Sequence, residues 1–230
     1  MTDLQANLIV MAACYLYIII VIAVAGYLKR GTLSPKGSRK FLHAMIGNLP
    51  LIMPYFTQSI FPFLVASPFI LVTFLATPYS PVPWISEKLS ALTDITEEGH
   101  HTGLMLYAIS YTALAYFYGT RPYIVAAGIF PMAYGDSTAA LIGMRYGRRR
   151  IGSKSLEGSA GMFLGSLISL LIGMAYFSGI YGFDLAGQLV PVLLVSIVVT
   201  VVELISPSGL DNIDVPILGA LTFLFAGGGV

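Results

Sequence analysis

Residues 8–28 read LIVMAACYLYIIIVIAVAGYL, an unbroken apolar run that is followed directly by Lys29 and Arg30. An α-helix needs about 20 apolar residues to cross the hydrocarbon core of a bilayer, and this run reaches that length. A cleaved signal peptide is the alternative, but its apolar part is only about 7–15 residues long and its basic residues come first. The run therefore predicts a permanent membrane helix near the start of the chain.

The composition extends this interpretation to the whole chain. Its 230 residues are 57% hydrophobic and 10% charged, whereas soluble domains carry about 25% charged residues. The apolar segments do not alternate as barrel strands do, so we expect helices. They fall at residues 6–28, 41–56, 60–77, 102–119, 121–143, 158–178, 187–205 and 215–229. We predict an all-α integral membrane protein, a polytopic bundle of about seven or eight transmembrane helices.

Residues 1–230 are expected to form a single transmembrane catalytic domain, because no segment is long enough for a separate soluble one. Prolines interrupt the second and third apolar segments at Pro50, Pro54, Pro62 and Pro68. A proline inside a helix removes a hydrogen bond and bends the axis, so these two segments are expected to be kinked or re-entrant. The single cysteine, Cys14, excludes a disulfide framework.

The charged residues gather on one side of the predicted membrane. Of the 12 Lys and Arg residues, all but Arg121 fall in the loops after the first, third and fifth segments. Basic loops stay in the cytoplasm, which predicts an outside N-terminus in the cell membrane and a cytoplasmic basic face. Of the 11 Asp and Glu residues, all but Asp3 and Asp184 map to the same side. Membrane insertion does not require this of carboxylates, so a polar active site facing the cytoplasm is indicated.

Asp136 lies inside the fifth segment, about two helical turns from its cytoplasmic end. A carboxylate at that depth costs about 2.5–3.5 kcal/mol on insertion scales and therefore indicates a functional site. Small residues recur every four positions around it, at Gly135, Ala139, Gly143 and Gly147, and again in the next segment at Gly161, Gly165, Ser169 and Gly173. Such rows let two helices approach closely, so we expect these segments to pack tightly with Asp136 near the seam. A structural carboxylate paired with an arginine is the alternative.

The loop that joins these two segments is short, basic and rich in glycine. Phosphate-binding candidates in and beside it are Arg145, Arg148, Lys154, Ser155 and Gly158. The free N–H groups at the start of the following helix would add anion-binding capacity, with Glu157 beside them. A topology-setting loop that binds lipid headgroups is the alternative.

Acidic and amide side chains also precede the last apolar segment. Glu203 is followed by Ser208-Gly209-Leu210-Asp211-Asn212-Ile213-Asp214-Val215-Pro216. Carboxylate oxygens suit Mg²⁺, and Asp136 with Asp211 would supply two of them from different helices. An Asx-turn before a helix that starts at Pro216 is the alternative.

Two weaker signals remain. Arg39, His43 and Gly47 share a face at the start of the second segment, with Lys40 and Asn48 nearby, and are candidates to contact phosphate or a lipid alcohol. A basic collar at the membrane surface is the alternative. His100 and His101 lack the spacing of a zinc site, so a loop is the simpler interpretation, with Glu97 and Glu98 as a potential exception.

Taken together, three motifs resemble the polyprenol kinase family, which includes dolichol kinases, phytol kinases and CTP-dependent diacylglycerol kinases. They are Gly135-Asp136 with Ala139-Ala140 and Gly143, then Lys154-Ser155-Leu156-Glu157-Gly158, then Asp211-Asn212 with Pro216. Arg39-Lys40-Phe41-Leu42-His43 resembles the basic-histidine segment of that family, so the resemblance covers roughly residues 39–220.

The resemblance implies transfer of the γ-phosphoryl group of CTP to the hydroxyl of a membrane isoprenoid alcohol, with Mg²⁺. On the matched positions we expect Asp136 and Asp211 to hold the metal and Lys154 and the arginines to bind phosphates, with Asn212 at the same nucleotide site. Glu157 or Asp136 would orient or deprotonate the alcohol. Phytol, geranylgeraniol, dolichol and diacylglycerol stay open as acceptors, and so does the oligomeric state.

Two alternatives come from other classes of protein. CDP-diacylglycerol synthases share a related glycine-aspartate helix, but their Ser-Pro-Lys-Lys-Thr and Asp-Arg-x-Asp signatures read Ser153-Lys154-Ser155 and Asp211-Asn212-Ile213-Asp214 here, which favours the kinase. An ion-coupled transporter would use Asp136 as an intramembrane ion site. It would need polar residues continuing to the other membrane face, but the sixth and seventh segments are apolar beyond their cytoplasmic ends.

Overall fold

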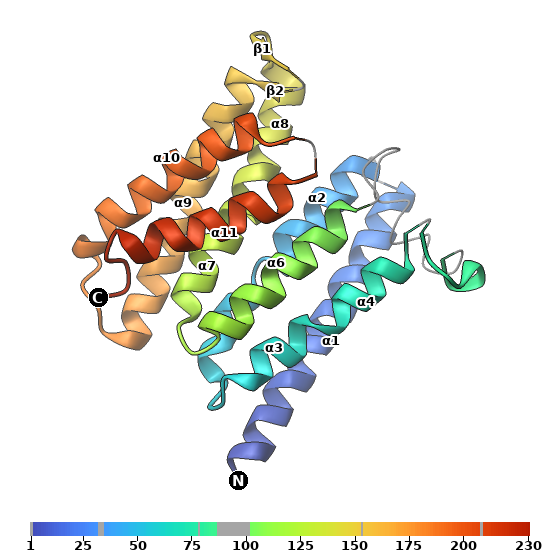
Figure 1. Ribbon diagram of the computed structural model, residues 1–230, viewed down its shortest axis with the longest axis vertical. Helices are drawn as coiled ribbons and strands as arrows, with labels where there is room; N and C mark the ends of the chain where they lie inside the picture. The colour runs from blue at the N-terminus through green and yellow to red at the C-terminus, as the bar shows by residue number, and fades with distance from the viewer. Residues whose placement is uncertain (1, 32–34, 78, 87–101, 153, 208) are drawn as a thin grey trace.

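The computed structural model describes residues 2–31, 35–77, 79–86, 102–152, 154–207 and 209–230 and shows a bundle of helices (Figure 1). The predicted all-α class is confirmed, apart from one small hairpin of β1 (Arg150–Ile151) and β2 (Lys154–Ser155). The α-helices are α1 (Asp3–Gly31), α2 (Pro35–Ile46), α3 (Ile60–Ala66), α4 (Pro68–Leu75), α6 (Gly103–Tyr118), α7 (Pro122–Phe130), α8 (Asp136–Tyr146), α9 (Leu156–Tyr181), α10 (Leu189–Ile205) and α11 (Asp211–Phe225). Lys88, Glu97, Glu98, His100 and His101 lie outside the described residues.

Four helices are long and apolar enough to cross a membrane, at Asp3–Leu28, Pro122–Tyr146, Leu156–Tyr181 and Ala186–Ile205. The chain is thus a helical membrane protein, but the predicted count of seven or eight spans is not confirmed within the described residues. A hydropathy profile counts apolar residues along the chain, but it does not locate the ends of helices. Helix α6 has only 16 residues and α11 only 15, so each is shorter than the bilayer core at 1.5 Å per residue.

Prolines break the second and third apolar segments, as predicted. Helix α2 stops at Ile46, and two 3₁₀ turns follow at Leu49–Leu51 and Met53–Tyr55, each with a proline in its first two positions. The third segment divides into α3 and α4 at Pro68. Residues 41–56 therefore do not form one membrane helix, which corrects that span, because each proline ends the ladder of helical hydrogen bonds.

The small-residue rows bring α8 and α9 into close contact, as expected. A Cβ added to Gly165 would lie 3.0 Å from the carbonyl oxygen of Tyr134, and one added to Gly161 would lie 3.0 Å from that of Thr138. A Cβ added to Gly135 would lie 2.3 Å from Ser166 Oγ. Any larger residue at these positions would force the two helices apart.

The helices form two groups that meet at α6. Helices α7 to α11 pack on one another around the fully buried Phe177 and Phe223, and α1 packs against α2 and α3. Helix α6 contacts both groups, because it packs against α3 and α4 on one side and α7 and α11 on the other (Figure 1). Residues far apart in sequence therefore face each other along α6.

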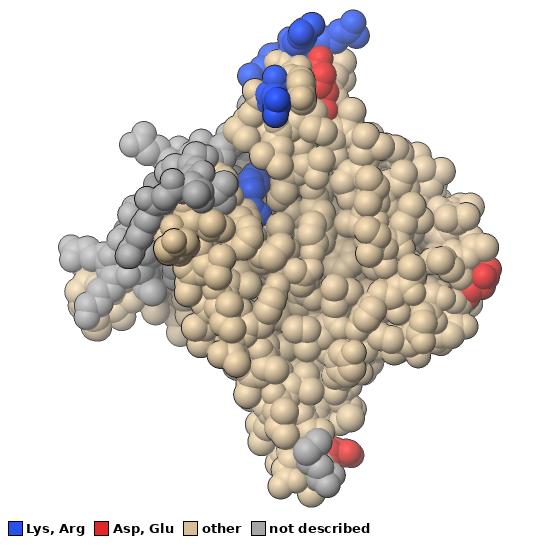
Figure 2. Space-filling view, turned by 180° about the vertical axis from the view of Figure 1, so that it is seen from behind, with Lys and Arg blue, Asp and Glu red and all other residues tan. Residues whose placement is uncertain are grey.

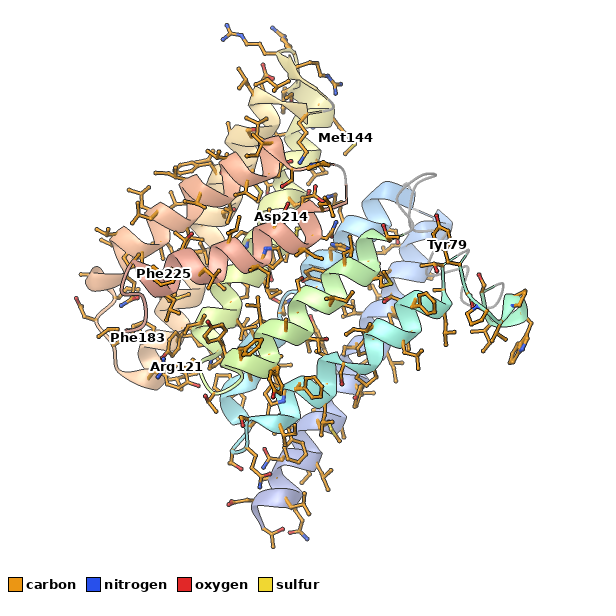
Figure 3. All side chains as sticks on the ribbon, viewed as in Figure 1. Tyr79, Arg121, Met144, Phe183, Asp214 and Phe225 are labelled. Atoms are coloured by element: carbon orange, nitrogen blue, oxygen red, sulfur yellow. The ribbon has the colours of Figure 1, made fainter. Side chains whose placement is uncertain are left out.

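The charges are unevenly distributed over the molecule. Figure 2 shows Lys and Arg side chains around one end, with acidic side chains beside them. Figure 3 places Arg121 toward the opposite end from Met144 and Asp214. This arrangement supports the predicted one-sided charge, while the orientation in a membrane stays a prediction.

Candidate functional site: a lysine and carboxylate cluster

Asp136 is the first residue of α8 and follows a π-helical turn over Pro131–Gly135. A π-turn inserts an extra residue into the helix and often marks a functional site. Gly135 faces α9, whereas the Asp136 carboxylate forms an ion pair with Lys40 of α2. Asp136 is thus close to the α8–α9 seam but points toward a different helix, and its cation is a lysine rather than an arginine.

Lys154 forms the second part of the site. It lies on β2, and its ammonium group contacts a Glu203 carboxylate oxygen at 2.9 Å and an Asp211 carboxylate oxygen at 3.4 Å. It also donates a hydrogen bond to the backbone carbonyl of Glu203. The β1–β2 hairpin therefore folds back over the end of α10 and the start of α11.

These two parts are close enough to act as one site. Glu203 and Asp211 share the ammonium group of Lys154, and Asp136 lies within electrostatic range of Glu203. We call the five residues Lys40, Asp136, Lys154, Glu203 and Asp211 the charged cluster. Their side chains are only 9% to 18% exposed. Three carboxylates against two lysines leave the charged cluster formally negative, which suits a bound cation.

The predicted catalytic residue Glu157 has a different setting. Its carboxylate accepts hydrogen bonds from the backbone N–H groups of Arg148 (3.1 Å) and Arg149 (3.2 Å), and the residue is half-buried. Ser155 caps α9 by accepting a hydrogen bond from Gly158 N at 3.1 Å. Glu157, Ser155 and Gly158 thus shape the hairpin that presents Lys154.

The arginines occupy the surface around the hairpin. Arg145 and Arg148 are both exposed, and the guanidinium carbon of Arg145 lies 5.5 Å from the ring centroid of Tyr146. A solvated phosphate could reach both arginines at the surface, whereas the side chain of Lys154 is only 18% exposed. Arg39 lies on α2, but its side chain is outside the described part of the structure.

The first turn of α11 is held by a polar network. Asn212 is buried and donates hydrogen bonds to Gly209 O and Asp211 Oδ1, both at 3.1 Å. The expected start of this segment near residue 215 is wrong, because α11 begins at Asp211 and contains Pro216. Pro216 has no N–H to donate to the Asn212 carbonyl, and Ser110 Oγ donates to that oxygen instead, at 2.9 Å. This contact anchors Asp211 and Asn212 against α6.

His43 lies one turn after Lys40 on α2, and it is buried. Its ring stacks on that of Tyr107 of α6 with centroids 4.8 Å apart. Tyr107 lies in turn within electrostatic range of Asp136. His43 is therefore located beside the charged cluster.

Sequence reasoning named Glu203 before the last apolar segment and Lys40 near His43 but gave neither a role at the site, and it did not name Tyr107. Lys40 shares a helical face with His43 and Gly47, at a spacing of three and four residues, and this was the available signal. Glu203 is an acidic residue at the end of an apolar helix, which is a weaker signal. Tyr107 lies in an aromatic stretch typical of a membrane helix, so the sequence alone does not single it out.

Comparison with known proteins supports the family assignment. A phytol kinase of Synechocystis sp. is 31% identical over 219 residues, which cover 92% of this chain and 88% of the relative. The protein named probable phytol kinase 1, chloroplastic, of Glycine max is 30% identical over 203 residues, which cover 82% of this chain and 66% of the relative. No family model and no solved structure matches the chain. The chain therefore belongs to the polyprenol kinase family that includes the phytol kinases.

Proposed function

We propose that this protein transfers the γ-phosphoryl group of CTP to the hydroxyl of an isoprenoid alcohol, at the cytoplasmic face of the membrane. The observation that carries the proposal is the placement of Lys154 between Glu203 and Asp211, close to Asp136. Phosphoryl transfer depends mainly on positioning and on neutralising phosphate charge, and two partly buried lysines beside three carboxylates offer both. The phytol kinase relatives support an alcohol of the isoprenoid class.

The lysines would exchange partners when the nucleotide binds. Lys40 forms an ion pair with Asp136, and Lys154 forms ion pairs with Glu203 and Asp211. The phosphate oxygens of CTP would take over these lysines, with Arg145 and Arg148 of the exposed loop as outer contacts. Before the nucleotide binds, the buried ion pairs would hold the lysines and carboxylates in place, so that the charged groups are already ordered.

Magnesium fits the carboxylates that the lysines would release. Mg²⁺ in nucleotide sites binds one or two carboxylates and completes its shell with phosphate oxygens and water. Within the described residues no three His, Cys, Asp or Glu side chains lie close enough together to hold an ion by themselves. Asp136 and Asp211 would hold the ion, and Glu203 is the third available carboxylate. The bound ion would neutralise charge on the phosphates.

Asp136 is better placed than Glu157 to act on the alcohol. In the proposed step the alcohol oxygen bonds to the γ-phosphorus, the bond to the β,γ-bridging oxygen breaks, and CDP leaves. The hydroxyl proton passes to a carboxylate. The Asp136 side chain is only 14% exposed inside the bundle, whereas the Glu157 carboxylate is already engaged by the backbone N–H groups of Arg148 and Arg149.

The test is a transfer assay on the purified protein in lipid nanodiscs. The protein is incubated with Mg²⁺, each γ-labelled nucleoside triphosphate in turn, and phytol, geranylgeraniol, dolichol or diacylglycerol. We expect label in an isoprenoid phosphate with CTP as the preferred donor. Absence of label from every alcohol, or release of pyrophosphate with phosphatidate, would overturn the proposal.

Lys154→Met tests the placement of the phosphate site. The variant keeps the length of the side chain but removes its charge, and we expect at least about a 100-fold loss of transfer. Arg121→Met, at the opposite end of the molecule, is the matched control and should stay within about twofold of the unmodified protein. Thermal unfolding of both variants shows whether they are folded.

A further inference from the structure

A partly open apolar cavity of about 90 Å³ lies between the N-terminal helices and α6. Its wall is formed by residues of α1, α2, α3, α4 and α6, and most of them are aliphatic. Representative lining residues are Ile18, Leu42, Val65, Phe69, Leu104 and Ala108. Apolar cavities of this kind stay free of water and accept apolar ligands.

One wall of the cavity adjoins the charged cluster. His43 and Tyr107 line it, and their rings stack at 4.8 Å. Lys40, one turn before His43 on the same helix, is paired with Asp136. The cavity is thus an apolar space next to a carboxylate proposed to act on an alcohol.

Two tyrosines that line this wall have buried hydroxyl groups that lack hydrogen-bond partners within the described part of the chain. They are Tyr107 and Tyr111, whose rings meet edge-to-face at 6.1 Å. Both side chains are almost fully buried, with 5% and 4% exposed. A buried hydroxyl without a partner costs about 1–3 kcal/mol, so a polar ligand atom beside Tyr107 would be stabilised.

We infer that this cavity binds the first isoprene unit of the lipid alcohol, and that Tyr107 positions its hydroxyl beside Asp136. This inference rests on the proposed function. A cavity that holds benzene measures about 150 Å³, so this smaller one admits about one isoprene unit. The remaining chain leaves between the helices into the bilayer.

The same geometry predicts selectivity against diacylglycerol. In that lipid the free hydroxyl is close to two ester groups, whereas an isoprenoid alcohol carries only hydrocarbon beyond its hydroxyl. Ester oxygens placed among Leu42, Val65 and Phe69 would lose their hydration without gaining hydrogen bonds. The cavity therefore selects the isoprenoid alcohol by the carbons next to its hydroxyl. Isoprenoid alcohols of different chain length should bind with similar affinity.

Filling the cavity tests this assignment. Ala108→Phe adds a ring to the lining of the cavity, and Ala113→Phe, on the same helix but outside the lining, is the matched control. We expect Ala108→Phe to raise the KM for both geraniol and phytol about tenfold, with kcat and the KM for CTP unchanged. Equal KM values for the two variants would overturn the assignment.

Tyr107→Phe tests the positioning role. It removes a hydroxyl without a partner in the described residues, so we expect an unchanged or higher thermal midpoint. The KM for the alcohol should rise about fivefold, since one hydrogen bond to the substrate is lost, while the KM for CTP stays the same. An unchanged KM for the alcohol would remove Tyr107 from the site.

A binding experiment without nucleotide separates this inference from the proposed function. Geraniol with a photoreactive diazirine on its first isoprene unit is irradiated with the protein, and the modified peptides are mapped by mass spectrometry. We expect modification of α2, α4 and α6, and its loss in Ala108→Phe. Modification only at lipid-facing helices would overturn the cavity assignment, even for a protein that phosphorylates alcohols. Modification of the cavity in a protein without any transfer activity would support the cavity assignment and overturn the kinase proposal.

Discussion

At the scale of single residues, the two carboxylates proposed for proton transfer differ in what they bind. Asp136 pairs with Lys40 inside the bundle, and its electrostatic neighbours are Glu203 and Tyr107. Glu157 binds the backbone of the loop that contains Arg148 and Arg149. A side chain that holds a turn can be replaced by one that makes the same hydrogen bonds, whereas a proton acceptor cannot.

Asp136→Asn and Glu157→Gln separate these roles. Loss of a general base typically lowers a rate by about 10²–10⁴-fold, and we expect Asp136→Asn to fall in this range. Glu157→Gln keeps an oxygen that accepts backbone N–H groups, so its kcat should drop by less than about tenfold. Saturating CTP and phytol are used so that kcat is compared directly. Equal losses of kcat in the two variants would contradict the preference for Asp136 over Glu157 as the base.

At the scale of elements, close packing of α9 on α8 places the hairpin and Lys154. Gly165 approaches the backbone of the π-helical turn, while Gly179, near the other end of α9, has open space around it. The polar network of Ser110, Asn212 and Pro216 fixes the start of α11 in a comparable way. In both cases a contact between helices, rather than the helix itself, determines where the site residues lie.

Gly165→Ala should destabilise this contact. Its new Cβ would lie 2.7 Å from Thr138 Oγ1 and 3.0 Å from the Tyr134 carbonyl oxygen, so the helices must separate. We expect a loss of about 1–3 kcal/mol in stability, measured as a lower midpoint of thermal unfolding in detergent. Gly179→Ala is the matched control and should leave the midpoint unchanged, because nothing lies within 4 Å of its added Cβ. Equal midpoints in the two variants would refute close α8–α9 packing.

Ser110 and Pro216 form a second testable pair. Ser110→Ala leaves the Asn212 carbonyl without its donor, which should cost about 1 kcal/mol. Pro216→Ala restores a backbone N–H that can donate to the same oxygen, so Ser110→Ala should cost less in that background. A double-mutant cycle on the unfolding midpoint measures the coupling. Additive effects would show that the two residues do not share this carbonyl.

At the scale of the whole molecule, charge and site lie toward the same end. The hairpin arginines occupy the end where Figure 2 shows the basic side chains, and the charged cluster lies at the adjacent ends of α8, α10 and α11. The predicted orientation puts this end in the cytoplasm, where a soluble nucleotide can reach it. The apolar cavity, lined by His43 and Tyr107 beside this site, is where we propose that a substrate in the membrane binds.

Single-cysteine labelling tests this orientation. Cys14→Ser removes the only native cysteine, and Arg149→Cys or Asp184→Cys then adds one at opposite ends of the molecule. In intact cells a membrane-impermeant thiol reagent should modify the Asp184→Cys protein but not the Arg149→Cys protein, which should react only after permeabilisation. The reverse pattern would place the active site outside the cell.

The sequence by itself determined the helical membrane class, the breaks at the prolines and the close approach of α8 and α9, and it predicted a site at Asp136, Lys154 and Asp211. These features follow from local rules: a bilayer demands apolar helices, proline ends a ladder of hydrogen bonds, and glycine rows admit a neighbouring helix. Only the tertiary structure decided that Asp136 meets Lys40, 96 residues away, that Glu203 joins Lys154, and that Tyr107 stands between the cavity and the site. The physical reason is that such contacts depend on how each helix is rotated and where it stops, and a π-turn or a short helix changes both without altering hydropathy.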